Sequence, residues 1–150
     1  MGKGQLILEI FLPYRLSVVT NRISGALSRH YATRFGISIP EWRVIANLGR
    51  HPGLSANEVA ERSAMDKVTV SRAVASLEEK GLLERVRDAG DKRRSRLSLS
   101  PKGQAVHGEI APLALGFERD LLTALTEEEV AQLDVIINKL NAKMDSMAGS

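Results

Sequence analysis

The spacing of apolar side chains predicts a chain that is mostly helical. Apolar residues recur at every third or fourth position over residues 13–35, which is typical of one face of a helix. We place the start of this helix at Pro13, because a proline inside a helix costs about 3 kcal/mol, and its end at Gly36. A second helix begins at Pro40 and ends before residues 51–53, which read His-Pro-Gly.

Two shorter helices with capping signals follow. Ser55 and Glu58 form an S-x-x-E capping box, which predicts a helix that ends near Arg62. After a short turn, Asp66 is a good N-cap for a helix over residues 67–80. Two short helices joined by about four residues are a candidate helix-turn-helix.

An alternating pattern then replaces the helical one. Residues 82–87 and 95–100 alternate apolar and polar side chains over part of their length, which predicts two short strands. Residues 88–94 between them combine turn-forming residues with a basic run. The order of helix, turn, helix and basic hairpin is typical of a winged helix-turn-helix.

The rest of the chain again has helical spacing. Ser100 and Pro101 fit the N-cap and first position of a helix in which Pro112 should cause a kink or an interruption. Thr126 and Glu129 form a second capping box, which predicts a last helix that runs to about residue 147.

These elements predict a mainly α fold of the α+β type, in a single domain over residues 1–150. Within it we expect a winged helix-turn-helix lobe over residues 37–100 and dimerisation helices over residues 6–36 and 101–147. The terminal helices carry apolar stripes that exceed what a helix pair in a small monomer needs to cover, which favours a homodimer; alternatively, the stripes pack within one chain. These stripes contain Leu16, Val19, Ile23, Leu133, Ile137 and Leu140.

The composition excludes several classes of protein. The chain has no cysteine, so disulfide scaffolds, thiolate zinc sites and thiol nucleophiles are excluded. Its three histidines are scattered, and it has no P-loop or nucleophile elbow, so we predict no metal, no cofactor and no enzymatic activity. The longest apolar stretch, residues 6–12, is far shorter than the roughly 20 residues of a membrane span. We therefore expect a soluble, cytoplasmic protein.

The charges are distributed unevenly along the chain. Residues 1–100 carry a net charge of +7 and residues 101–150 a net charge of −4, which together give the +3 of the whole chain. The densest basic run lies between Arg85 and Lys102. This asymmetry favours one surface that faces a polyanion, although solvated faces can also differ by chance.

The helix over residues 67–80 has two unlike faces. Val70, Val74 and Leu77 lie on one face and should pack inward, whereas the other face has small and hydrogen-bonding side chains that suit a DNA groove. A valine methyl can contact a thymine methyl, and an arginine can reach a guanine edge or a phosphate. The alternative is an ordinary solvated helix face. Together with the preceding capping serine, the predicted DNA contacts on these helices are Ser55, Lys67, Val68, Thr69, Ser71 and Arg72.

The basic hairpin supplies the other predicted DNA contacts. Asp91 lies two positions before Arg93 and can orient its guanidinium by a charged hydrogen bond. An arginine held in this way can enter a narrow minor groove, with Arg94 and Arg96 along the phosphates. Alternatively, Asp91 only favours the turn.

The sequence over residues 40–103 resembles the MarR family of bacterial winged helix-turn-helix regulators. Its most specific segments are TVSRAVASLEEKGLLER and DKRRSRLSLSPKG, and the second contains the D-x-R wing signature as Asp91 and Arg93. The flanking helices also fit, so the resemblance covers nearly the whole chain. It implies a homodimer built from the terminal helices, recognition helices in major grooves, wings in minor grooves and ligand-responsive control of transcription.

The resemblance also implies an effector, such as an aromatic carboxylate, a phenolic or another lipophilic small molecule, bound between the dimer helices and the DNA-binding lobe. Side chains able to clamp an aromatic acid by charge and stacking are Arg22, His30, Tyr31, Trp42 and Arg43. Alternatively, Tyr31 and Trp42 are core residues and His30 is an interfacial histidine.

The sequence therefore predicts a sequence-specific DNA-binding transcriptional regulator, a ligand-responsive repressor that binds a pseudo-palindromic operator as a homodimer. Its expected partners are double-stranded DNA, a second copy of the chain and a small effector. The alternative is a winged-helix nucleoid or protein-interaction module without strong sequence preference.

Overall fold

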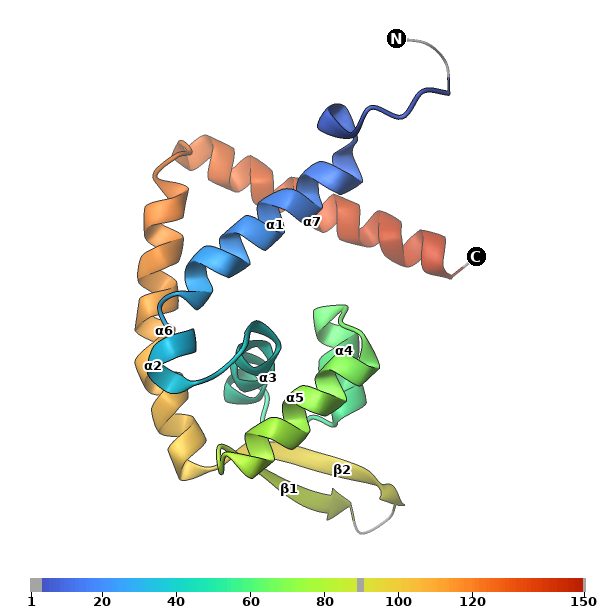
Figure 1. The fold of residues 1–150 in the computed structure, drawn as a ribbon. Helices are drawn as coiled ribbons and strands as arrows, with labels where there is room; N and C mark the ends of the chain where they lie inside the picture. The colour runs from blue at the N-terminus through green and yellow to red at the C-terminus, as the bar shows by residue number, and fades with distance from the viewer. Residues whose placement is uncertain (1–3, 89–90, 150) are drawn as a thin grey trace. The chain divides into compact units, whose positions relative to one another are not determined.

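The computed structural model describes residues 4–88 and 91–149, and within these it describes the backbone alone for residues 87, 88 and 91–94 (Figure 1). The chain divides into two compact units, Met1–Pro112 and Leu113–Ser150. The elements in chain order are a short 3-10 helix η1 (Leu8–Ile10), α1 (Leu12–Ser28), α2 (Ala32–Phe35), α3 (Ile39–Arg50), α4 (Ala56–Ser63), α5 (Lys67–Glu79), β1 (Leu83–Asp88), β2 (Asp91–Leu99), α6 (Pro101–Leu122) and α7 (Glu127–Ala148).

The helix predicted over residues 13–35 is broken into α1 and α2, so that prediction is wrong. α1 has its proline in the first turn, as expected, but ends at Ser28. The N–H groups of residues 29–31 each donate to a carbonyl three positions earlier, which tightens and closes the helix. Tyr31 then leaves helical geometry and buries its side chain in the core, where it is 1% exposed. α2 ends at Gly36, whose positive φ of 66° fits the predicted stop.

The helices α3, α4 and α5 each begin at a side-chain cap. Ser38 and Glu41 form a capping box at α3 that the sequence analysis overlooked, in which Ser38 N donates to Glu41 Oε1 at 2.9 Å. The predicted box of Ser55 and Glu58 is present at α4. Asp66 caps α5, as predicted. The helix-turn-helix of α4 and α5 is therefore confirmed.

One hydrophobic core holds these three helices against the sheet. α5 packs on α3, α4 and β1, and α3 also packs on β2. The largest side chains buried in this core include Ile45, Leu48, Val59, Val70, Val74, Leu77 and Leu97. Burial on one side fixes the orientation of α5 and leaves its other side to solvent.

The predicted hairpin is present as the antiparallel pair of β1 and β2, whose register shifts between Arg87 and Asp88. β2 begins at Asp91, so the prediction that the turn extends to Arg94 is wrong. Lysine and arginine have no turn preference of their own, and the strand geometry continues through them. Residues 89–90, which belong to the predicted turn, lie outside the described residues. The helices and this small sheet confirm the mainly α, winged-helix fold.

α6 begins at Pro101, as predicted, and runs through Pro112 without interruption. Of the two outcomes predicted for that proline, the interruption is therefore excluded. Ser100 is the predicted N-cap, because its Oγ accepts a hydrogen bond from Gly103 N at 3.0 Å and donates one to Gly81 O at 2.6 Å. This serine joins the end of the hairpin to the start of α6.

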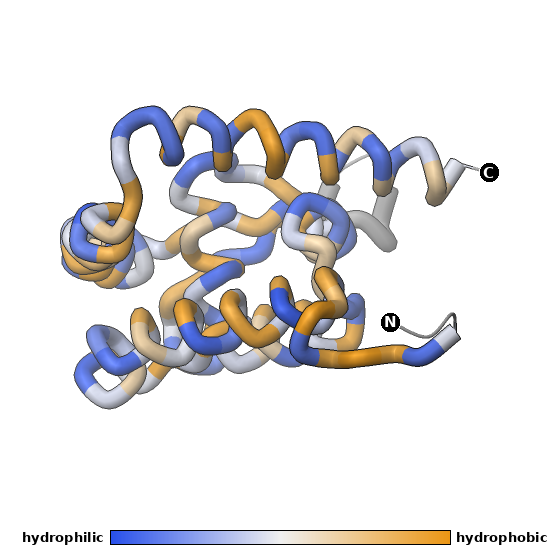
Figure 2. Tube along the Cα trace, turned by 90° about the horizontal axis from the view of Figure 1, so that it is seen from above, coloured by the Kyte–Doolittle hydropathy of each residue, from blue (hydrophilic) through white to orange (hydrophobic). Residues whose placement is uncertain are grey.

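The second unit contains α7, whose predicted capping box of Thr126 and Glu129 is present. Hydrophobic residues recur along the whole helix, which Figure 2 shows as orange bands on the tube that ends at C. None of them is buried in this chain. The exposed large side chains of α7 are Leu133, Val135, Ile136, Ile137, Leu140, Met144 and Met147.

Candidate nucleic-acid interface

One side of α5 is buried in the core, and five of the predicted DNA contacts lie together on the opposite side. We call this surface the α5 face, and it consists of Lys67, Val68, Thr69, Ser71 and Arg72, all exposed. The hairpin strand β1 packs against the same helix, so the α5 face and the hairpin belong to one compact unit (Figure 1).

The first turn of α5 is fixed by Asp66. Its Oδ2 accepts a hydrogen bond from Thr69 N at 3.1 Å and lies 3.4 Å from Thr69 Oγ1. The remaining N–H groups at a helix start and the helix dipole favour phosphate. Lys67, the first residue of the helix, adds a positive charge at the same end.

Ser55, the predicted contact at the start of α4, is the N-cap of that helix. Its Oγ accepts a hydrogen bond from Glu58 N at 3.1 Å, which caps the helix. A hydroxyl can accept and donate at once, so a phosphate contact by Ser55 is compatible with this cap.

A buried acid, which sequence reasoning missed, ties α5 to α3. Glu41 is 6% exposed, and its Oε2 accepts hydrogen bonds from Lys80 Nζ at 2.8 Å and from Ser76 Oγ at 2.9 Å. Lys80 also donates to Gly36 O at 2.6 Å. The S-x-x-E spacing of residues 38–41 could have revealed the cap, but not the partners that lie 35 and 39 residues away.

This environment lowers the pKa of Glu41. Burial acts to raise the pKa, but the hydrogen bonds from Lys80, Ser38 and Ser76 outweigh it and hold the pKa below the ordinary value of 4.5. The charged carboxylate is thus the stable form, and it fixes the C-terminal half of α5 relative to α3.

We expect Glu41→Gln to lower the free energy of unfolding by about 1–2 kcal/mol at pH 7, because the variant loses the charge that pairs with Lys80. A lowered folded-state pKa contributes stability above the unfolded pKa and loses it as the pH falls through the folded value. The difference between the two proteins in urea titrations should therefore shrink below about pH 4.5. Glu79→Gln, at an exposed glutamate of α5, is the control. A difference that stays constant down to pH 3 would contradict the ionic role of Glu41.

The hairpin carries the remaining predicted contacts. The side chains of Asp91, Arg93 and Arg94 lie outside the described part of the structure, and Arg96 is exposed on β2. On β1, Arg85 Nη2 donates to Glu78 Oε1 of α5 at 2.7 Å, so an ion pair links this strand to the helix.

Three of the predicted effector residues, Tyr31, Trp42 and Arg43, make contacts that link α1, α3 and the core. Tyr31 and Trp42 have ring centroids 5.8 Å apart, and Arg43 Nη2 donates to Ser24 Oγ at 3.0 Å. Burial raises the pKa of Tyr31, and the positive charge of Arg43 opposes that rise. Arg22 and His30 are exposed.

His107 of α6, which the sequence analysis treated only as a scattered histidine, extends this aromatic group. Its ring centroid lies 6.0 Å from that of Trp42. Gly49 makes room for it, because a Cβ at that position would overlap the imidazole. The position of His107 one turn before the buried Ile110 was the signal that could have drawn attention to it.

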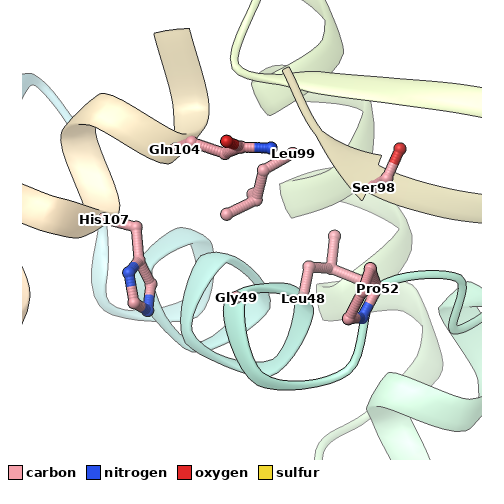
Figure 3. Close-up of a pocket in the computed structure, with 7 residues that line it drawn as sticks. All are labelled: Leu48, Gly49, Pro52, Ser98, Leu99, Gln104 and His107. Atoms are coloured by element: carbon pink, nitrogen blue, oxygen red, sulfur yellow. The ribbon is translucent and has the colours of Figure 1, made fainter. Parts of the chain in front are cut away.

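His107 also lines a pocket of about 310 Å³ between the end of α3, the end of β2 and the start of α6 (Figure 3). Its apolar part is formed by Leu48, Leu99 and Pro52, and its polar part by Ser98, Gln104 and His107. Within the described residues, no group of histidine and acidic side chains could hold a metal ion. In the same part of the chain, no helix is long and apolar enough to cross a membrane.

A family model of the MarR family matches residues 35–94, which reach from the end of α2 into β2. The HTH-type transcriptional regulator BilQ of Clostridium symbiosum is 32% identical over 105 residues, which are 70% of this chain and 73% of that protein. The chain belongs to the MarR family.

Solved structures of other MarR-type regulators share this fold. A MarR/EmrR family regulator from Acinetobacter sp. ADP1 is 29% identical and superposes with a TM-score of 0.85, over 94% of this chain and 99% of that one. The PcaV regulator of Streptomyces coelicolor, solved with its natural ligand, is 25% identical with a TM-score of 0.78, over 93% and 97% of the two chains. As a member of the MarR family, the chain is a DNA-binding transcriptional regulator and not an enzyme.

Proposed function

We propose that this MarR-family protein is a homodimeric, ligand-responsive repressor that binds a pseudo-palindromic operator. The observation that carries the proposal is the exposed α5 face, rich in hydrogen-bonding side chains, beside a basic hairpin in the same compact unit. In this proposal residues 37–100 form the DNA-binding lobe, in which α5 enters a major groove and the hairpin reaches a neighbouring minor groove. Residues 6–36 and 101–147 form the dimerisation region.

The exposed apolar surface supports the dimer. Apart from Val68 and Val86, every large hydrophobic side chain exposed in the described chain lies in residues 6–19 or 115–147. Extensive exposed apolar surface on a folded chain marks an interaction site. A second copy would bury it and place two α5 helices about one turn of DNA apart, at about 34–36 Å.

Two observations support the ligand response: the side chains around Trp42 and a ligand-bound structure of a similar protein. Trp42 and Arg43 are partly exposed and offer stacking surface and a positive charge, which suit an aromatic acid or a phenolic compound, whereas Tyr31 is buried in the core beside Trp42. PcaV, which has the same fold, was solved with a natural ligand. By linkage, an effector that releases DNA must bind the DNA-free form more tightly than the DNA-bound form.

Selection from a pool of random DNA duplexes tests the proposed function. We expect enrichment of an inverted repeat whose half-site centres lie about 10 base pairs apart, bound by two chains. A pool that shows no enrichment would reject the repressor and leave the nucleoid or protein-interaction module. The net charge of +7 over residues 1–100 favours DNA as the partner of this region. A protein-binding function would be favoured by an acidic wing instead.

The wing offers a test in which the sign of the effect is decisive. Arg93→Ala should weaken operator binding about tenfold or more, since it removes a minor-groove arginine. If Asp91 orients Arg93, as the proposal holds, Asp91→Ala should also weaken binding, although it removes a negative charge. Gel-shift titrations measure both effects. If Asp91→Ala strengthens binding instead, the wing acts only as a positive patch.

A further inference from the structure

Two exposed hydrophobic side chains stand apart from the proposed dimerisation surface. Val68 of α5 is 55% exposed and Val86 of β1 is 61% exposed, whereas the other exposed large hydrophobics of the described chain belong to the terminal segments. Both valines lie on the two elements that the proposed function places against DNA. Val68 gains little from burial in the free protein, and valine is a poorer helix former than alanine or lysine.

Val68 lies in the first turn of α5, the part of the helix that the proposed function places nearest the bases. It is the second residue of the helix, and the N-terminal residues of a recognition helix are those that contact base edges. Arg72 and Ala75 follow at spacings of four and seven residues, so all three lie along one exposed stripe. Val70 and Val74, which point into the core, lie on the opposite side.

The chemistry of valine restricts what it can read. Its side chain has no donor or acceptor, and thymine alone presents an apolar group, the C5-methyl, in the major groove. We infer that Val68 selects a thymine in each operator half-site by packing against this methyl group, an inference that rests on the proposed operator binding. Val68 is thus a specificity-determining residue of the regulator.

The rest of the helix agrees with recognition from the thymine side. Adenine is usually read by the bidentate amide of asparagine or glutamine. Neither residue occurs in α5, Lys67–Glu79. An A·T pair under this helix therefore has no bidentate amide to read its adenine, and the thymine methyl is the group of that pair that matches the apolar side chain of Val68.

Deoxyuridine tests the inference, because it removes the C5-methyl and leaves base pairing intact. The full-length protein is first used to select its operator from random duplexes. Each thymine of that operator is then replaced in turn by deoxyuridine, and binding is measured for the unaltered protein, Val68→Ala and Val86→Ala. Val86→Ala is the matched control, since it makes the same change at an equally exposed valine of the hairpin.

We expect one thymine in each half-site at which deoxyuridine weakens binding by about three- to fivefold, the effect of one buried methyl group. Val68→Ala removes the contact from both half-sites of the proposed dimer, so it should weaken binding to the unaltered operator by about ten- to twenty-fivefold, the square of that factor. It should also abolish the preference for thymine at this position. Val86→Ala should keep the preference.

Two other results overturn the inference in distinguishable ways. A protein that selects an operator but shows no thymine preference that depends on Val68 rejects the inference and leaves the proposed function intact. A protein that selects no operator at all rejects the proposed function, and the inference falls with it. Circular dichroism confirms that the variants are folded, as expected for substitutions at exposed positions.

Discussion

The double variant Ile137→Asp, Leu140→Asp is expected to be a folded monomer that binds the operator at least 100-fold more weakly than the unaltered protein. Both side chains are exposed in the single chain and lie on one stripe of α7 with Met144. Burying two aspartates in an apolar interface is costly, so association of the two copies should fail. A monomer binds one half-site and loses the gain of about 10²–10⁴ that two linked sites provide. Sedimentation and gel-shift titration measure the two effects.

Lys139→Asp is a control with the same change in net charge. Lys139 is exposed and lies off the stripe, so this variant should remain a dimer with only a modest loss of affinity. If the double variant stays dimeric, the stripe is not the interface. If the double variant does not fold, the unaltered protein still decides the question, because the unfolding midpoint of a dimer rises with protein concentration.

Gly103→Ala is expected to lower the free energy of unfolding by about 3 kcal/mol. A Cβ at this position would overlap the carbonyl oxygen of Leu82, and backbone cannot move aside as a side chain can. The same carbonyl accepts a hydrogen bond from Ser100 N at 3.1 Å, and Gly103 N donates to Ser100 Oγ at 3.0 Å. The substitution therefore strains the junction through which the hairpin enters α6.

Gly108→Ala is the matched control for this prediction. Gly108 lies in the same helix, and a Cβ there would meet nothing within 4 Å. Alanine in a helix is favoured over glycine by about 0.5–1 kcal/mol, so this variant should be slightly stabilised. Urea denaturation measures both. Equal stability of the two variants would show that the close contact at Gly103 relaxes at little cost.

Local signals allowed much of the fold to be predicted. The capping residues Ser55, Asp66 and Thr126 act on backbone groups within three positions of themselves, so sequence alone identifies the helices that they start. The alternation of apolar and polar residues is also a local signal, and it located the two strands. The α5 face followed from helical periodicity, because burial of one side of a helix determines which residues remain exposed.

The parts that could not be predicted depend on contacts between distant residues. The break before Tyr31 results from burial of that ring in the core, and nothing nearby in the sequence signals it. The bonds from Ser76 and Lys80 to Glu41, and the approach of His107 to Trp42, likewise join residues on different helices. Their geometry appears only when the core is assembled.

The most direct test of the proposed regulator compares two DNA duplexes of equal length, the intergenic DNA beside its own gene and a random sequence, over a series of salt concentrations. We expect a large preference for the adjacent DNA, with affinity that falls by a log-log slope of about −0.9 for each phosphate neutralised. Equal affinity for both duplexes, or binding that does not depend on salt, would contradict a sequence-specific regulator that holds DNA through the α5 face and the basic hairpin.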